Sequence, residues 1–380
     1  MSSLDARLDV LRGTSLPLPH NARTLAALTA NPACDRRSLI DAAGIDKDAL
    51  AAHLGLPRPL RKSQLALKHG LAFEHRVIGR DHAELVRLLR EALDLALPEV
   101  AYEDLNSVAN GEDRSSPQLR HARTRSLIIS AATNKSAPRT LLNHPVLRLP
   151  VAGHHVYLEP DVVAFHHDGT FHVVEIKSFP VIYGQADPAS VAAALTQTAA
   201  YVLALRDLLA DEGLPPERVS DTVVLINPLN FTQRPTATLE SAHRQIRSLR
   251  RHLDRLRRLP ELLDQLPLDT TFDLALDPHG KPTRPRSELT AALARLNPLY
   301  TPHCRRHCDL AIHCRNEARS RDRTEALGTT VREDIAGITT VTTALDLADG
   351  RLHPADAQED ITRALRHAQR LYTDLQAGTA

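Results

Sequence analysis

The chain has 380 residues, of which 42% are hydrophobic and 24% are charged. This composition is typical of a globular protein and excludes a disordered or fibrous chain, and the length allows one large domain or two ordinary ones. The net charge of +1 excludes a chain that attracts polyanions by its total charge, although a basic stripe can exist within a neutral total. Aromatic residues make up only 3%, so we expect a core of Leu, Ala and Val, with long helices around a modest sheet.

The N-terminal segment MSSLDARLDVLRG contains acidic residues where a signal peptide would have an unbroken apolar run. No segment approaches the roughly 18 consecutive apolar residues of a membrane span. We therefore expect a cytoplasmic protein that does not contact a membrane. In that reducing compartment, metal binding is a commoner role for clustered cysteines than disulfide formation.

Five consecutive regions are expected along the chain. Residues 1–100 are predicted to be helical with polar breaks, and residues 101–150 to be an irregular polar insertion or flap. Residues 151–300 are predicted to form an α/β core, because strand-like runs alternate there with helical ones. Residues 301–320 hold three of the four cysteines, and residues 321–380 are predicted to form a C-terminal helical appendage.

The core region begins with a predicted β-hairpin. Two β-rich runs, residues 155–165 and 170–176, lie on either side of an Asp-Gly pair, which is a strong hairpin signal. An Ala/Leu helix is predicted over residues 189–210, and a third buried strand over residues 222–228 (TVVLINP). A basic helix follows at residues 240–259.

The length of the hairpin loop decides which side chains share a face. A three-residue loop centred on Asp168 would place Asp161 opposite Glu175, and Lys177 would lie on the same face because side chains alternate along a strand. A two-residue loop would turn Asp161 to the other face. A site that uses both carboxylates therefore requires the longer loop or a β-bulge.

Two carboxylates that converge at a strand end form a site for Mg²⁺ or Mn²⁺, which prefer oxygen ligands. Such a cation can hold a phosphate oxygen, activate a water molecule and stabilise the leaving oxygen. Lys177 could orient that water or offset the developing negative charge. The alternative is that Glu175 and Lys177 form a solvated ion pair on an exposed face.

The segments Glu159-Pro160-Asp161 and Glu175-Ile176-Lys177 resemble the signature of the PD-(D/E)XK nucleases. The resemblance implies a restriction-endonuclease-like central mixed sheet flanked by helices. It also implies a divalent-metal-dependent deoxyribonuclease that hydrolyses phosphodiester bonds. In such an enzyme Asp161 and Glu175 would bind Mg²⁺ or Mn²⁺, and Lys177 would assist the water or the phosphate.

Two further elements resemble the RecB-like branch of that superfamily. Gln197 and Tyr201 match its QxxxY helix, and because they lie four residues apart they share a helix face. The resemblance implies that they position the substrate or Lys177. Gly70 and Glu74 match the GxxxH/E element, whose last residue approaches the metal. His75 is adjacent, and which of Glu74 and His75 points inward stays open.

The cysteines form a one-plus-three arrangement, in which Cys34 stands far upstream of Cys304, Cys308 and Cys314. Zinc sites usually contain CxxC pairs, which this chain lacks. An iron–sulfur cluster needs four thiolates and does not require such pairs. A Cys/His zinc site stays open as the alternative, because a histidine precedes each clustered cysteine (His303, His307 and His313).

The one-plus-three arrangement resembles the iron–sulfur members of the RecB-like nucleases, which include CRISPR-associated adaptation nucleases and the nuclease domain of AddAB. The resemblance implies a structural 4Fe-4S cluster, bound by the four cysteines, that staples the N- and C-terminal regions together. The three-residue gap between Cys304 and Cys308 departs from the commoner two-residue gap of the family.

The basic helix is a candidate surface for DNA phosphates. Its arginines include Arg244, Arg247, Arg250, Arg251, Arg255 and Arg258. The expected partner is DNA, with a helicase or a defence-complex protein as a possible second partner, and the expected role is DNA repair, recombination or anti-phage defence. Two alternatives stay open: a catalytically silent DNA-binding subunit of such a complex, and a zinc-stapled scaffold that binds proteins.

Overall fold

The computed structural model describes most of the chain. The described residues are 3–18, 31, 34–57, 64–79, 82–94, 100–105, 117–134, 139–151, 154–167, 169–230, 232–256, 259–301, 304–324, 329–335 and 337–377. The fold is mixed α/β, as predicted, and helices predominate.

The chain divides into two compact units, and each unit combines segments that are far apart in sequence. Unit 1 contains Met1–Leu18, Ala30–Pro59 and Glu261–Ala380, and unit 2 contains Pro19–Thr29 and Leu60–Pro260. The five predicted regions were continuous segments, whereas both units are discontinuous.

In the described part of unit 2, six strands form one mixed sheet in the order β1-β2-β5-β6-β9-β10. β1 is parallel to β2 and β6 is parallel to β9, while the other neighbours are antiparallel. β6 and β9 are buried along almost their whole length, which agrees with their Val- and Ile-rich sequences and with helices on both faces. The strands are β1 (Val100–Asp104), β2 (Arg139–Asn143), β5 (Val162–His167), β6 (Thr170–Ile176), β9 (Thr222–Pro228) and β10 (Pro235–Ser241).

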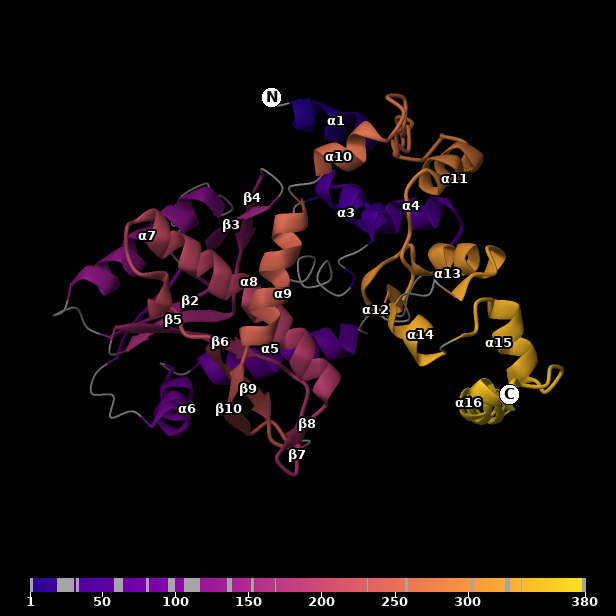
Figure 1. Cartoon of the computed structure of the whole chain (residues 1–380). Helices are drawn as coiled ribbons and strands as arrows, with labels where there is room; N and C mark the ends of the chain where they lie inside the picture. The colour runs from indigo at the N-terminus through magenta and orange to yellow at the C-terminus, as the bar shows by residue number, and fades with distance from the viewer. Residues whose placement is uncertain are drawn as a thin grey trace. The chain divides into compact units, whose positions relative to one another are not determined.

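Helices α5 (Gln64–Ile78) and α6 (Ala83–Leu93) cover one face of this sheet (Figure 1). Phe73 of α5 belongs to a buried apolar cluster that includes Val174 and Ile176 of β6. Helix α6 contributes Leu85, Leu88 and Leu89 to the same cluster. These residues recur at helical spacing and therefore lie on one face of α6.

Helix α8 (Pro188–Asp211) contacts the sheet through β6, and α9 (His243–Leu256) packs against α8. The side chain of Asp187 caps α8 by accepting a hydrogen bond from the Ser190 N–H at 2.8 Å, and the helix ends just before Gly213, whose φ is +70°. Among the described helices, α8 alone has the length and apolar content of a membrane span, and 56% of that stretch is buried within the fold.

Unit 2 also contains two small hairpins. β3 (Leu147–Val151) pairs with β4 (His154–Leu158), and helix α7 (Pro117–Thr133) packs on both. The second hairpin pairs β7 (Val181–Ile182) with β8 (Gln185–Ala186). A short 3₁₀ helix, η1, follows α8 and comprises Pro216–Arg218.

The prediction that residues 101–150 are irregular is wrong. The region contains most of β1, then α7, β2 and nearly all of β3, while residues 106–116 lie outside the described residues. These strands have only five residues each, and their stability comes from partners elsewhere in the sequence, because β2 pairs with both β1 and β5. Local sequence patterns cannot reveal strands that depend on such pairing.

Unit 1 is helical in its described residues and joins the two ends of the chain. The N–H of Phe272 donates to the carbonyl of Leu11 at 2.7 Å, and the His53 imidazole lies 2.8 Å from the carbonyl oxygen of Arg284. The helices are α1 (Ser3–Arg12), α3 (Asp35–Ala42), α4 (Lys47–His53), α10 (Leu259–Asp264), α11 (Arg286–Ala294), α12 (Cys304–His307), α13 (Ala311–Ser320), α14 (Thr329–Asp334), α15 (Val341–Ala348) and α16 (Glu359–Ala377), with a 3₁₀ turn η3 (Asp356–Gln358).

Candidate active site and cysteine cluster

The β5–β6 hairpin brings Asp161 to the side of the sheet that holds Glu175. His167 pairs with Thr170, so the loop has two residues, and Asp168 itself lies outside the described residues. With an uninterrupted ladder, this short loop would turn Asp161 away from Glu175. A β-bulge between Val163 and Phe165 adds one residue to β5 and restores the pairing of Val162 with Val174. The next position on each strand is Asp161 and Glu175.

Neighbouring strands then present their functional groups at one end of the sheet. The N–H of His144, directly after β2, donates to the carbonyl of Asp161 at 3.1 Å. The N–H of Lys177, directly after β6, donates to the carbonyl of Ile226 at 2.9 Å. The amide of Asn227 donates to the Lys177 carbonyl at 3.2 Å, which holds the end of β6 in place.

Glu175 lies at the centre of this site, and its side chain is fully buried. Burial raises its pKa to about 7, the Lys177 ammonium acts in the opposite direction, and the negative charges of Asp161 and Glu74 add to the rise. Lys177 donates a hydrogen bond to Oε1 of Glu175, while Oε2 has no hydrogen-bond partner among the described residues. A buried carboxylate oxygen without a partner is costly unless a ligand supplies positive charge.

Glu74 reaches the same site from α5. It is half-buried and His75 is exposed, so Glu74 is the residue of the pair that points inward. Burial raises the pKa of Glu74 and the charge of Asp161 raises it further, while His144 and Lys177 lower it. Gly70 lies one turn earlier, where an added Cβ would come within 3.7 Å of the Ser178 hydroxyl.

Gln197 and Tyr201 approach from α8 on the other face of the sheet. The amide of Gln197 donates to the Tyr201 hydroxyl at 2.9 Å. Tyr201 is buried, and burial raises its pKa well above the ordinary value, with further rises from Glu175 and Asp161. The Tyr201 hydroxyl therefore lies near Glu175 and Asp161, the two carboxylates that the sequence analysis predicted as metal ligands.

Sequence reasoning missed two residues at the edge of this site, His144 and Arg120. His144 has a left-handed backbone, with a φ of 46°, and its Nε2 lies 3.9 Å from Oε1 of Glu74. Arg120 donates to the His144 carbonyl at 2.9 Å and to both carboxylate oxygens of Glu159 at 2.9 and 2.7 Å. The region containing Arg120 and His144 had been predicted to be irregular, so no strand end marked either residue as part of a site.

The donors that converge here are oxygens, which suits Mg²⁺ or Mn²⁺. Among the described residues, no three His, Cys, Asp or Glu side chains already lie close enough together to hold one ion. Lys177 forms an ion pair with Glu175, so a divalent cation bound by Glu175 would have to displace that ammonium.

The four cysteines all belong to unit 1 and are all free thiols. Cys34 directly precedes α3, and the other three lie on or beside α12 and α13. Burial raises the pKa of Cys314 to about 12, and the charges of Cys308 and Cys34 add to this rise. Burial likewise raises the pKa of Cys34, with a contribution from Cys304. The distant Cys34 is thus near enough to interact with the C-terminal cysteines.

Hydrogen-bond donors and buried cations surround these thiols. Arg36 is almost fully buried, and its guanidinium donates to Sγ of Cys314 at 3.2 Å and to Oε2 of Glu317 at 2.7 Å. The amide of Asn31 donates to Sγ of Cys304 at 3.3 Å. Burial lowers the pKa of Lys47 to about 8, as does the charge of Arg37, while Cys308 acts in the opposite direction. Such surroundings fit an anionic group ligated by thiolates.

The histidines of the zinc alternative are only partly described. His303 and the side chain of His307 lie outside the described residues. Burial lowers the pKa of His313, as does the nearby Arg36, and its Nε2 lies 3.9 Å from Oε2 of Glu317. Both the all-cysteine and the Cys/His ligand sets therefore stay open.

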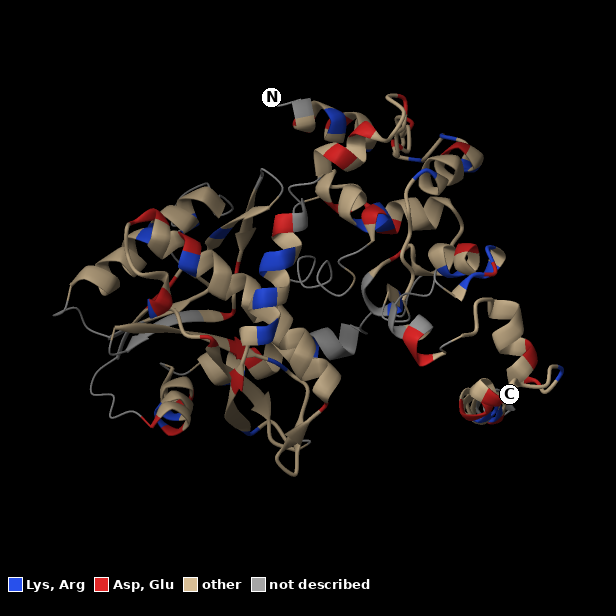
Figure 2. Ribbon diagram, in the orientation of Figure 1, with Lys and Arg blue, Asp and Glu red and all other residues tan. Residues whose placement is uncertain are grey.

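The basic helix α9 exposes its arginines in a row (Figure 2). Arg244, Arg247, Arg250 and Arg251 are exposed, whereas Ile246, Leu249 and His252 are buried on the opposite side. The helix is therefore anchored by one apolar face and offers the other to solvent. The side chain of Arg255 and the whole of Arg258 lie outside the described residues.

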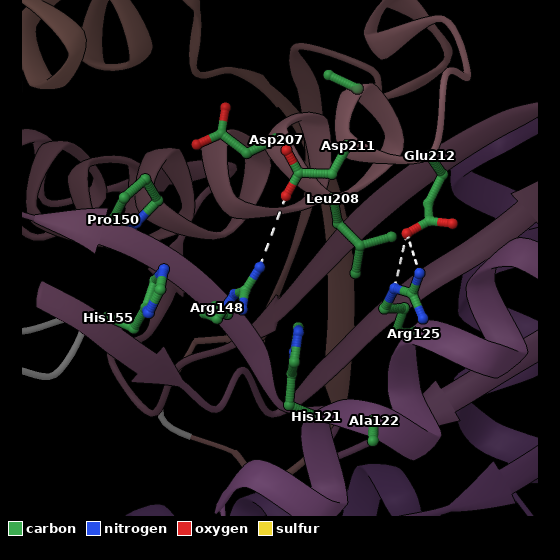
Figure 3. Close-up of a pocket in the computed structure, with 11 residues that line it drawn as sticks. His121, Ala122, Arg125, Arg148, Pro150, His155, Asp207, Leu208, Asp211 and Glu212 are labelled. Atoms are coloured by element: carbon green, nitrogen blue, oxygen red, sulfur yellow. Dashed lines mark hydrogen bonds and ion pairs between the residues drawn. The ribbon is translucent and has the colours of Figure 1, made fainter.

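A pocket of about 640 Å³ lies elsewhere in unit 2, between α7, the β3–β4 hairpin and the C-terminal end of α8 (Figure 3). Its charges are largely paired, because Arg148 lies 3.6 Å from Asp211 and Arg125 donates to Glu212 at 2.7 Å. None of the predicted catalytic residues lines it. The strand-end site, with its unpartnered buried carboxylate oxygen, is the better candidate for chemistry.

No protein-family model matches the chain, and no curated protein matches it in sequence. Function is therefore inferred from the residues and their geometry.

Proposed function

We propose that the protein is a divalent-metal-dependent deoxyribonuclease of the PD-(D/E)XK type. One observation carries the proposal: Asp161, Glu175 and Lys177 meet at one end of the sheet, with Glu74 and Tyr201 approaching from helices on its two sides. The sheet order, with α5 and α6 on one face and α8 on the other, supports a restriction-endonuclease-like core.

Asp161 and Glu175 are the proposed ligands of Mg²⁺ or Mn²⁺, and Glu74 assists. A bound cation would polarise the phosphate and lower the pKa of the attacking water. Only the ionised form of Glu175 can bind it, so affinity should increase as the pH rises through about 7, the pKa of the buried carboxyl.

Lys177 neutralises Glu175 in the metal-free site. With a cation held by Asp161 and Glu175, the Lys177 ammonium would be available to the phosphate, where it would offset the negative charge that develops during attack. Gln197 orients the Tyr201 hydroxyl, and the buried phenol closes the inner wall of the site beside Glu175.

The cysteines are the proposed ligands of a structural 4Fe-4S cluster, with zinc as the alternative. The N–H donors of Arg36 and Asn31 to cysteine sulfurs support an anionic thiolate site. The exposed arginines of α9 are the proposed contacts to DNA phosphates. A helicase or a defence-complex protein stays the proposed second partner, and repair, recombination or phage defence the proposed setting.

The decisive experiment incubates anaerobically purified protein with end-labelled single- and double-stranded DNA. Cleavage is expected with Mn²⁺ or Mg²⁺ and is expected to stop with EDTA. Asp161→Asn should abolish it, while Glu103→Gln, which changes an ion-paired carboxylate elsewhere in unit 2, should not. If the wild-type protein binds DNA but cleaves none, the catalytically silent DNA-binding subunit becomes the correct function.

A further inference from the structure

The hairpin of β7 and β8 begins four residues after Lys177 and extends from one end of unit 2 (Figure 1). Val181 pairs with Ala186 and Ile182 with Gln185, so Tyr183 and Gly184 form a two-residue turn. Their φ values are 49° and 78°, both positive, as a type I′ turn requires.

Tyrosine is a poor residue for this position. A type I′ turn favours Asn, Asp or Gly, because a side chain with a bulky Cβ substituent clashes in the left-handed region. The Tyr183 side chain is also 95% exposed, so its ring gains nothing from packing. Neither the turn nor the core explains an aromatic residue here, in a chain with only six Tyr and six Phe.

The turn is nevertheless held firmly. The Tyr183 N–H donates to Oδ1 of Asn230 at 3.3 Å, and the Asn230 N–H donates to the carbonyl of Val181 at 2.7 Å. The amide of Asn227 donates to the carbonyls of Lys177 and Phe179 at 3.2 and 3.1 Å. The end of β9 and the residues that follow it thus hold both the hairpin and the end of β6. Tyr183 lies six positions after Lys177, so their Cα atoms are at most ~22 Å apart.

We propose that Tyr183 stacks on an unpaired base of the substrate beside the cleavage site, so that the preferred substrate is single-stranded or frayed DNA. The inference rests on the proposed nuclease function. A planar aromatic ring presented to solvent on a hydrogen-bonded turn is suited to stacking on any base, because every base has a π-face. A protein interface is disfavoured, because the exposed residues that follow Tyr183 in the described hairpin, Gly184 and Gln185, add no large apolar side chain beside it.

The test compares Tyr183→Asn with Tyr183→Phe. Asn suits a left-handed turn, so Tyr183→Asn should melt at the same or a higher temperature than the wild type. It should nevertheless bind a single strand containing 2-aminopurine roughly tenfold more weakly in EDTA, with less quenching of the base. Tyr183→Phe should bind like the wild type. The matched control is Leu239→Asn, which changes another exposed apolar residue of unit 2 and should alter nothing.

In steady-state cleavage, Tyr183→Asn should raise KM for single-stranded DNA and leave kcat unchanged, with no effect on blunt duplex. Unchanged single-strand binding by Tyr183→Asn would overturn the proposal, as would equal losses on single strand and duplex. If Tyr183→Phe bound single-stranded DNA weakly, the contact would be made by the hydroxyl, and the stacking proposal would also be overturned. Loss of a co-purifying protein instead of DNA would assign the ring to a protein partner. Binding is measured without metal, so stacking can hold even if cleavage fails.

Discussion

Glu175 combines two opposing properties: it is fully buried, and the chemistry proposed for it needs its charged form. Its pKa lies at about 7 in the folded chain, against an ordinary value of 4.5. Between pH 4.5 and 7 the folded chain therefore binds a proton at Glu175 that the unfolded chain has lost. The free energy of unfolding decreases as the pH rises through this range. A functional group of this kind is expected to lower stability at neutral pH.

We expect Glu175→Gln to abolish cleavage and to stabilise the metal-free protein at pH 8. The gain is at most on the order of 3 kcal/mol, because a charged carboxylate is replaced by a neutral amide of the same shape. It should shrink as the pH falls from 7 towards 5. Thermal melts in EDTA at pH 5.5 and pH 8 measure both values. A difference in melting temperature that does not grow with pH would contradict the raised pKa.

Lys177→Ala is expected to lower kcat by roughly 10³-fold or more, because it removes the positive charge aimed at the transition state. DNA binding in EDTA should change little. Lys68→Ala is the matched control, because Lys68 is an exposed lysine on α5 of the same unit. Undiminished cleavage by Lys177→Ala would remove Lys177 from the mechanism.

Individual residues were predictable where chemistry and spacing coincide. Strand alternation and a motif predicted Asp161, Glu175 and Lys177 as site residues. Whether they share a face depended on a longer hairpin loop or a β-bulge, and the structure contains the bulge. His144 was not predictable, because its role follows from a backbone hydrogen bond to Asp161 across strands. Arg36 likewise gains its role from two partners far away in sequence, the buried sulfur of Cys314 (278 positions) and the carboxylate of Glu317 (281 positions).

At the scale of elements, α9 is the clearest test of DNA binding. Replacing its four described exposed arginines with Gln should weaken DNA binding and flatten its salt dependence. The expected change in the slope of log K against log salt is about 0.7–0.9 for each lost phosphate contact. Fluorescence anisotropy in EDTA at several salt concentrations measures it. Arg363 and Arg370, which are exposed on α16, provide a control pair whose replacement should leave the slope unchanged.

Elements were predictable when their signals were local. The hairpin of β5 and β6, helix α8, strand β9 and basic helix α9 all follow from periodicity, turn residues and caps, and the structure contains each of them. The run predicted as one strand over residues 155–165 is divided, however, between β4, which pairs with β3, and β5. β1 and β2 were missed because they pair in parallel across the whole of α7. The parallel pairing of β6 with β9 across α8 was equally invisible to local patterns, although each strand was predicted separately.

For the whole molecule, the cysteines make the strongest prediction. Protein purified without oxygen should be brown and absorb broadly near ~400 nm, as iron–sulfur clusters do and zinc does not. Cys34→Ser should remove that absorbance and lower the melting temperature of unit 1, because a ligand-closed loop this long strongly restricts the unfolded chain. Removing the metal from the wild type should lower it similarly. A colourless protein with one bound zinc would establish the Cys/His alternative.

The discontinuous units also dictate an order of events during translation. Unit 1 needs residues from both sides of unit 2, so its N-terminal helices must wait while Leu60–Pro260 is synthesised. At about 5–20 residues per second, this wait lasts about 10–40 s. The segment around Cys34 leaves the ribosome long before Cys304. For that interval it has a single thiol, and the side chains that α3 buries in the folded protein lack their C-terminal partners. Insertion of the proposed cluster would therefore have to follow the synthesis of Cys314, the last of its proposed ligands.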